Sequence, residues 1–298
     1  MAARKKFQGT GTALVTPFKK DGTLDEASLR RLVDFQVKGG VEAIIPVGTT
    51  GESPSLTHEE HDRVFHIVKE QSRGKLRIFG GTGSNSTRTA IEHTRMAKAA
   101  GLDAALIVGP YYNKPTQEGY FQHYRAIAEA VDIPIIVYNV PGRTGGNIEA
   151  ATTLRMAEET PNVIAVKEAS GNLAQIMEIA RNKPKDFSLL SGDDSITLPL
   201  VALGGDGCIS VVANEVPRDF SDMVRACLKG NWKKALALHN KLLPLMNVNF
   251  IESSPIPVKA AMAMMGMIEE VYRLPLVPIS AKNREKLKAV LVDQKLVR

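Results

Sequence analysis

The sequence VIAVKEASGN at residues 163–172 places Lys167 directly after an almost unbroken run of apolar residues. Such a run does not alternate apolar with polar side chains, which is typical of a parallel sheet covered on both faces. Similar runs recur along the chain, with helical patterns between them. They are ALV at 13–15, AIIPV at 43–47, RIF at 77–79, AALIV at 104–108, PIIVY at 134–138, VIAVK at 163–167, FSLL at 187–190 and GCISVV at 207–212.

The segments between these runs have the size of βαβ crossovers, and several carry helix start signals. Asp25 stands in the N-cap position of the first predicted helix. Thr57 followed by Glu60 predicts a capping box at the next. Asn147 and Asn172 are candidate N-caps of later helices.

Eight βα units predict a TIM (β/α)8 barrel, with an open doubly wound sheet as the alternative. After the eighth run the strand signals stop, and helices are predicted at 232–246, 257–265 and 281–294. We therefore predict a catalytic barrel over residues 1–230 and a C-terminal helical domain over residues 231–298.

The composition is that of an ordinary globular protein, with 44% hydrophobic residues, 23% charged residues and a net charge of +6. No basic helix with interleaved aromatic residues is present, which argues against nucleic-acid binding. No apolar run is long enough to predict a membrane span. The two cysteines, Cys208 and Cys227, form no CxxC motif, so we expect reduced thiols and a cytoplasmic protein.

In a TIM barrel, the chemistry takes place at the C-terminal ends of the strands. Lys167 ends one run and Tyr138 ends the preceding run, so the two side chains are predicted to be neighbours. Burial disfavours an ammonium ion, and a neutral amine is what attack on a ketone requires. A phenol beside it can transfer protons. Taken alone, however, a lysine at the end of a strand is more often a solvated residue at the rim of the barrel.

Three further residues of the predicted rim are candidates for binding carboxylates. Thr49 and Thr50 offer hydroxyl and backbone N–H groups, although simple turn chemistry also explains them. Arg143 can hold a carboxylate bidentately, with a surface salt bridge as the alternative.

His58 and His61 resemble metal ligands at first, but no third ligand is evident, and a solvated helix face is the preferred interpretation.

Several sequence blocks match a known family in the same order along nearly the whole chain. These are GTTGE at 48–52, GPYYNKP at 109–115, YNVPGRTG at 138–145, KEASGN at 167–172, SGDD at 191–194 and PIPVKAA at 255–261. With these blocks the chain resembles the dihydrodipicolinate synthase branch of the pyruvate-dependent aldolase superfamily.

The resemblance implies a role for each matching residue. Lys167 would form an imine with pyruvate, and Tyr138 would transfer protons through hydrogen bonds to Thr49 and Tyr112. Tyr112 would reach in from a neighbouring subunit, which implies a homotetramer built as a dimer of dimers. The substrate-binding groups implied are Thr50 for the pyruvate carboxylate, Arg143 for the carboxylate of aspartate semialdehyde, and the backbone of Gly192 and Ile209. No metal and no organic cofactor is implied.

The reaction that the resemblance implies is condensation of pyruvate with L-aspartate 4-semialdehyde to 4-hydroxy-tetrahydrodipicolinate, on the diaminopimelate route to lysine. The alternatives are cleavage of a larger keto acid, such as N-acetylneuraminate or a keto-deoxy sugar acid, and a barrel that binds a carboxylate without turnover. Arg143 favours the condensation, because it suits a short carboxylated aldehyde better than a polyol chain.

The resemblance also implies a candidate allosteric site, because lysine inhibits many members of the family at a cleft between subunits. The matching residues are Ser53, His58, His61, Asn85 and Tyr111. Thr89 stands where a glutamate commonly contacts the amine of the inhibitor. We therefore expect weakened lysine binding.

Overall fold

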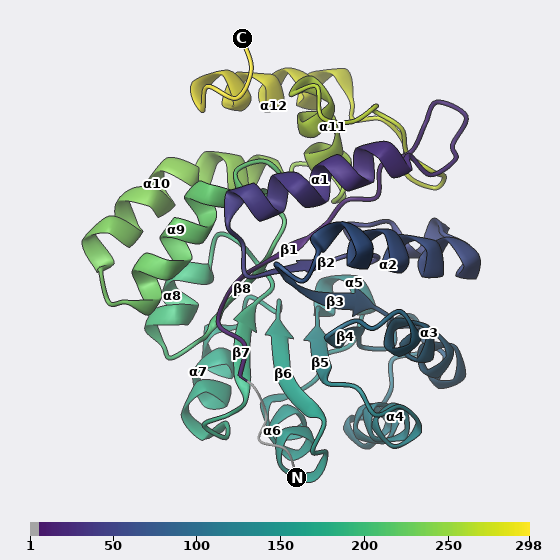
Figure 1. Cartoon of the computed structure of the whole chain (residues 1–298). Helices are drawn as coiled ribbons and strands as arrows, with labels where there is room; N and C mark the ends of the chain where they lie inside the picture. Colours follow the sequence, from purple (N-terminus) through teal and green to yellow (C-terminus); the bar gives the residue numbers. More distant parts are fainter. Residues whose placement is uncertain (1–5) are drawn as a thin grey trace.

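The computed structural model describes residues 6–298, so residues 1–5 of the predicted barrel lie outside it. Parallel strands form a closed barrel in chain order, and the first strand pairs with both the second and the eighth (Figure 1). The predicted TIM barrel is therefore confirmed, and the open doubly wound sheet is wrong. The strands are β1 (Gly9–Ala13), β2 (Ala43–Ile45), β3 (Arg77–Gly81), β4 (Ala104–Val108), β5 (Ile135–Asn139), β6 (Val163–Glu168), β7 (Ser188–Ser191) and β8 (Gly207–Ser210).

Helices surround the barrel and cover the outer face of its strands (Figure 1). They are α1 (Glu26–Gly39), α2 (His58–Ser72), α3 (Thr87–Ala99), α4 (Gln117–Ala130), α6 (Ala150–Glu159), α7 (Leu173–Asn182), α8 (Thr197–Ala202) and α9 (Pro217–Leu228). Short helical turns interrupt three of the loops. They are η1 (Ser53–Ser55), α5 (Pro141–Thr144) and η2 (Val212–Asn214). None of the helices within residues 6–298 has the length and apolar character needed to span a membrane.

The chain ends in the three helices predicted for it, α10 (Trp232–Val248), α11 (Ile256–Met264) and α12 (Ala281–Asp293). They share a buried apolar cluster with α9 and with Cys208 of β8. In Figure 1, α11 and α12 lie beyond α1. The division of the chain near residue 230 stays a prediction.

Most of the predicted helix caps are confirmed. The side chain of Asp25 accepts from the backbone of the first helix turn, Thr57 and Glu60 form the reciprocal capping box, and Asn172 caps α7. Asn147 was wrong as a cap, because α6 begins after Glu149. The side chain of Asn147 instead joins a network of amides behind β5.

The first strand lies earlier in the chain than predicted, at Gly9–Ala13 instead of 13–15. Its sequence, GTGTA, lacks the large apolar residues by which the other strands were found, yet every residue of it is buried. A side chain at Gly11 would collide with the barrel interior, 2.7 Å from Ile45. Thr12 hydrogen-bonds to Gln36 of α1 on the outer face, at 2.7 Å. Small residues thus allow close packing at this strand.

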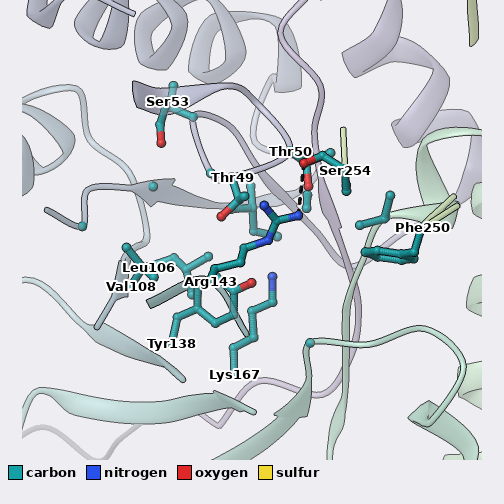
Figure 2. A pocket seen from close by; sticks show the side chains of 18 residues that line it. Thr49, Thr50, Ser53, Leu106, Val108, Tyr138, Arg143, Lys167, Phe250 and Ser254 are labelled. Carbon is teal, nitrogen blue, oxygen red and sulfur yellow. Dashed lines mark hydrogen bonds between the residues drawn. The ribbon is translucent and has the colours of Figure 1, made fainter. Parts of the chain in front are cut away.

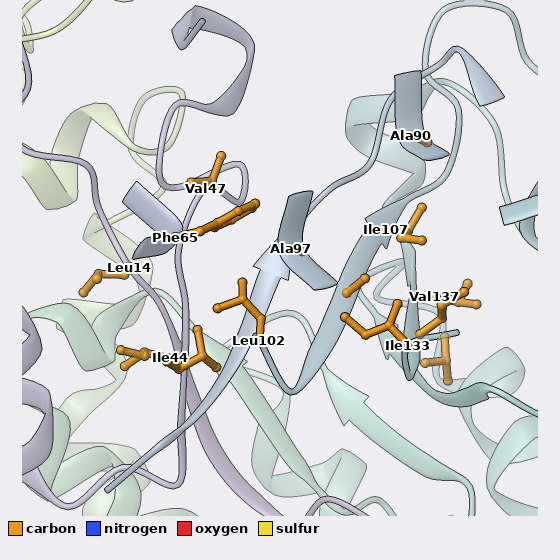
Figure 3. Packing of buried hydrophobic residues seen from close by; sticks show 14 of the residues in the cluster. Leu14, Ile44, Val47, Phe65, Ala90, Ala97, Leu102, Ile107, Ile133 and Val137 are labelled. Carbon is orange, nitrogen blue, oxygen red and sulfur yellow. The ribbon is translucent and has the colours of Figure 1, made fainter. Parts of the chain in front are cut away.

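Two apolar layers hold the barrel together. Figure 3 shows part of the outer layer, in which Phe65 of α2 and Ala97 of α3 belong to the same buried cluster as Ile44 of β2 and Ile107 of β4. The inner layer fills the barrel with residues that point to its axis. Since successive side chains of a strand point to opposite faces, β2 to β7 contribute residues to both layers.

Candidate active site

Lys167 and Tyr138 lie side by side at the end of the barrel, on neighbouring strands (Figure 2). The register of β5 and β6 pairs the two residues directly, and the Lys167 Nζ lies 4.1 Å from the centroid of the Tyr138 ring. Both side chains are almost buried, and Lys167 is 5% exposed. The prediction that the two side chains are neighbours is confirmed. A buried amine can attack a carbonyl group, and a phenol beside it can transfer protons.

A polar network on the outer face supports these two strand ends. Glu168 and Asn139 are the next residues of β6 and β5, and their side chains point away from the axis. The buried Glu168 carboxylate accepts hydrogen bonds from Asn139 Nδ2 at 3.0 Å, from Gln175 Nε2 at 2.9 Å and from the backbone of Ser170 at 2.7 Å. Sequence reasoning missed these residues, although polar residues that directly follow the apolar runs were the available signal.

The Lys167 amine faces a cavity at the mouth of the barrel (Figure 2). The predicted site residues on its wall are Thr49, Thr50, Tyr138, Arg143, Lys167 and Gly192, with Ser53 from the candidate allosteric set. A side chain at Gly192 would lie 3.0 Å from Lys167 Cε, so glycine keeps this wall open. The structure does not bring Ile209 to the wall. It is fully buried in the inner layer, and Val211 lines the cavity instead.

The loop that follows β2 places Thr49 and Thr50 on the cavity wall. It begins at Val47 and ends at Glu52, and both of these residues have positive φ, at 58° and 55°. The backbone of Glu52 donates to Thr49 O at 3.1 Å, which closes a tight turn. A side chain at Gly81 of β3 would lie 2.0 Å from Val47 O, so the loop fits only against a glycine.

Arg143 reaches over the same cavity from α5, the short helix after β5 (Figure 2). Its Nη2 donates to the carbonyl of Ser254 at 3.1 Å. Ser254 and Phe250, which also lines the cavity, come from the segment between α10 and α11. The sequence carries no spacing signal that would have brought this distant segment to the barrel mouth.

The sequence profile of the dihydrodipicolinate synthetase family matches residues 6–294. The chain belongs to this family. It is 55% identical over 294 residues to the 4-hydroxy-tetrahydrodipicolinate synthase of Chloroherpeton thalassium, covering 99% of this chain and 97% of the relative. With the enzyme of the same name from Koribacter versatilis it shares 53% identity, over 97% and 96% of the two chains. The resemblance found in the sequence is thereby confirmed.

Solved structures of the family have the same fold. Dihydrodipicolinate synthase from Aquifex aeolicus superposes with a TM-score of 0.95 at 46% identity, over 97% of this chain and 99% of that one. The chloride-inhibited enzyme from Acinetobacter baumannii, solved in complex with pyruvate, superposes with a TM-score of 0.95 at 44% identity, over 97% of this chain and 99% of that one. A structure described as the first monomeric variant of the enzyme superposes with a TM-score of 0.96 at 44% identity, over 98% of both chains.

Tyr112 lies outside the cavity of its own chain. It is 89% exposed and has a positive φ of 72° in the loop between β4 and α4. Its backbone N–H donates to Thr144 O at 3.3 Å, which ties this loop to α5. The structure therefore does not bring Tyr112 together with Tyr138 and Thr49 within one chain.

A second cavity adjoins the first and shares Thr49, Ser53 and Arg143 with it. Of the candidate allosteric residues, Ser53, His58, His61 and Tyr111 line this second cavity, together with Thr89. Asn85 is not on its wall; the Asn85 carbonyl accepts from Asn113 at 2.9 Å.

His93 joins His58 and His61 in this cavity, which sequence reasoning missed. Its ring centroid lies 4.6 Å from each of theirs. The solvated face predicted for the pair was wrong for His61, which is buried. Burial lowers the pKa of His93 to about 4 and also lowers the pKa of His61, so both rings are neutral at pH 7. Within residues 6–298, no group of three or more His, Cys, Asp or Glu side chains is arranged to hold a metal ion.

Proposed function

We propose that this protein is a Schiff-base-forming lyase that condenses pyruvate with L-aspartate 4-semialdehyde to 4-hydroxy-tetrahydrodipicolinate. The observation that carries the proposal is the buried Lys167 amine, 4.1 Å from the Tyr138 ring in a cavity that Arg143 overhangs. Relatives more than half identical to this chain bear the name of this synthase. As an enzyme of the diaminopimelate route to lysine, with both cysteines unpaired, it is expected in the cytoplasm.

The reaction begins with attack of the Lys167 amine on the keto carbon of pyruvate. Loss of water gives an imine, and loss of a methyl proton gives an enamine. The enamine carbon attacks the aldehyde of the second substrate, and the amine of that substrate then displaces Lys167 as the ring closes. Tyr138 moves the protons of the first steps, with Thr49 beside it on the cavity wall. Thr50 and the loop backbone hold the pyruvate carboxylate. Gly192 and Val211 line the pocket, whereas Ile209 is buried in the inner layer.

The imine is testable by chemical trapping. Borohydride added in the presence of pyruvate should fix the ligand to Lys167 as a stable secondary amine, located by mass spectrometry of the Lys167 peptide. Lys167→Ala should show no adduct. The buried Lys259 provides an internal control, because its amine pairs with Glu52 outside the cavity and should stay unlabelled. No adduct on Lys167 would rule out both the condensation and the retro-aldol alternative.

Arg143 is the proposed ligand of the semialdehyde carboxylate. Replacing it by alanine removes charge-assisted hydrogen bonds, so kcat/KM for the semialdehyde should fall by about a hundredfold. Borohydride trapping of pyruvate on Lys167 should stay close to that of the unchanged enzyme. Arg125→Ala, which removes a surface arginine paired with Glu129 on α4, is the control. Turnover of the semialdehyde at an unchanged rate in Arg143→Ala would remove this residue from the site.

We also propose that the protein assembles as a homotetramer, a dimer of dimers. In this assembly the exposed Tyr112 would complete the site of a neighbouring subunit, where it would join Tyr138 and Thr49. Leu173 and Met177 lie one turn apart on α7 and are 41% and 47% exposed, which supports a second apolar contact between subunits.

The assembly can be measured by sedimentation. The unchanged protein should sediment as a tetramer, and Leu173→Glu with Met177→Glu should shift it to dimers, because the added charges would be buried in the contact. Val292→Glu, a change at another exposed apolar residue, on α12, is the matched control and should leave the tetramer intact. A monomer at all concentrations in the unchanged protein would contradict the proposal.

The second cavity is the proposed regulatory site, with weakened affinity for lysine. No carboxylate of the described residues lines it, and its buried histidines are neutral at pH 7, so its wall offers no negative charge to the ammonium group of lysine. Thr89→Glu should strengthen inhibition by lysine by about tenfold or more, since a charge-assisted hydrogen bond is restored. Initial rates measured against lysine concentration test this. Equal sensitivity of the two proteins would show that Thr89 does not set the affinity.

A further inference from the structure

A buried ion pair joins the C-terminal helices to the loop that carries Thr49 and Thr50. Lys259 of α11 is completely buried, Glu52 at the end of the loop is 2% exposed, and Lys259 Nζ contacts Glu52 Oε1. Neither residue lines the cavity at the barrel mouth. The pair therefore lies behind the site and cannot touch substrate.

The surroundings of the pair satisfy both charges. The Lys259 amine lies 4.4 Å from the centroid of the Phe18 ring and 5.2 Å from that of Tyr272, which gives it favourable cation–π contacts. Glu52 Oε2 accepts from the backbone of Arg273 at 3.2 Å. Burial lowers the pKa of Lys259, and the Glu52 carboxylate opposes this shift. A charge buried in this way is tolerated only while its partner is present.

The ion pair holds the loop from Val47 to Glu52, whose backbone conformation is strained at both ends. Val47 and Glu52, at the two ends of the loop, have the left-handed backbone conformation that residues other than glycine avoid. Such conformations persist where surrounding contacts enforce them. At the Val47 end, β3 and Gly81 provide close packing. At the Glu52 end, the side chain is fixed by Lys259 and by the backbone of Arg273.

We propose that Lys259 and Glu52 are positioning residues for pyruvate, which act by holding Thr50 and its neighbouring backbone in the conformation that binds the carboxylate. The inference rests on the proposed role of Thr50. The C-terminal helices thereby take part in substrate binding without contributing a group that touches pyruvate.

A second buried lysine pair provides a matched control for stability alone. Lys183, which follows α7, lies 3.1 Å from Asp206, and both side chains are less than a tenth exposed. Asp206 directly precedes β8, so this pair lies at the end of the barrel opposite to the cavity. Lys183→Met and Lys259→Met each remove the amine of a buried ion pair, although Asp206 keeps Lys6 as a second partner at 2.6 Å, and we expect only Lys259→Met to loosen the loop.

Steady-state kinetics distinguish positioning from stability. An enzyme that binds its substrates in turn through a covalent intermediate has an independent kcat/KM for each. Lys259→Met should lose about tenfold or more in kcat/KM for pyruvate and much less in that for the semialdehyde, if breaking the pair displaces Thr50. Lys183→Met should lower Tm and leave both kinetic constants close to normal. Equal losses for the two substrates in Lys259→Met would indicate only a smaller folded fraction and would overturn the proposal.

The double variant Glu52→Gln/Lys259→Met keeps the test decisive if Lys259→Met folds poorly. It removes both charges, so Tm should recover, while kcat/KM for pyruvate should stay low because the loop is no longer fixed to α11. Recovery of Tm and of kcat/KM for pyruvate together would overturn the proposal.

Thr50→Val tests the proposed role of Thr50 separately from that of the ion pair. If this change lowers kcat/KM for pyruvate while both Lys259 variants do not, the positioning role fails alone. If Thr50→Val has no effect, the proposed role of Thr50 fails.

Discussion

The register of β6 against β5 is the constraint on which the site depends. It places Lys167 beside Tyr138 inside the barrel and Glu168 beside Asn139 outside it. Because side chains alternate along a strand, a slip of one residue would turn Glu168 into the barrel and remove the amine from the cavity. The hydrogen bonds between Glu168 and Asn139 exist only in the observed register. The contact between Glu168 and Asn139 outside the barrel therefore stabilises the register that places Lys167 beside Tyr138 inside it.

The loops of the site depend on a second support, which comes from the C-terminal helices. The segment that opens α11 provides the Ser254 carbonyl that orients Arg143, and Lys259, one helix turn further on, holds Glu52. One short stretch of chain thus fixes both the arginine above the cavity and the threonine loop at its wall. Without these helices, the loop after β2 would keep its packing on Gly81 and α5 would keep its hydrogen bond to Tyr112, but Glu52 and Arg143 would lose these partners. The C-terminal helices are in this sense part of the site, although among the described residues that follow α9 only Phe250 and Ser254, between α10 and α11, line the cavity.

The strands and the central pair of the site could be predicted because their signals are local in the sequence. Long apolar runs marked most strands, and the ends of two of them marked Tyr138 and Lys167. The first strand was misplaced because Gly9–Ala13 owes its burial to small residues, which carry no apolar signal. Asn147 was misassigned because the same amide can cap a helix or join a network. Contacts between distant segments, such as His93 with His61 or Ser254 with Arg143, leave no spacing pattern to find.

Burial by itself does not identify the reactive lysine, because Lys167, Lys183 and Lys259 are all largely removed from solvent. Lys183 pairs with Asp206 and Lys259 with Glu52, and each carboxylate opposes the lowering of the lysine pKa by burial and occupies the amine. Lys167 forms no ion pair with any carboxylate of residues 6–298, and its close neighbour is the face of Tyr138. A ring contributes only about 0.5–2 kcal/mol to binding a cation, and it leaves the amine accessible from the cavity. Three lysines of similar burial are thus divided by their partners into two that hold the fold and one that is available for chemistry.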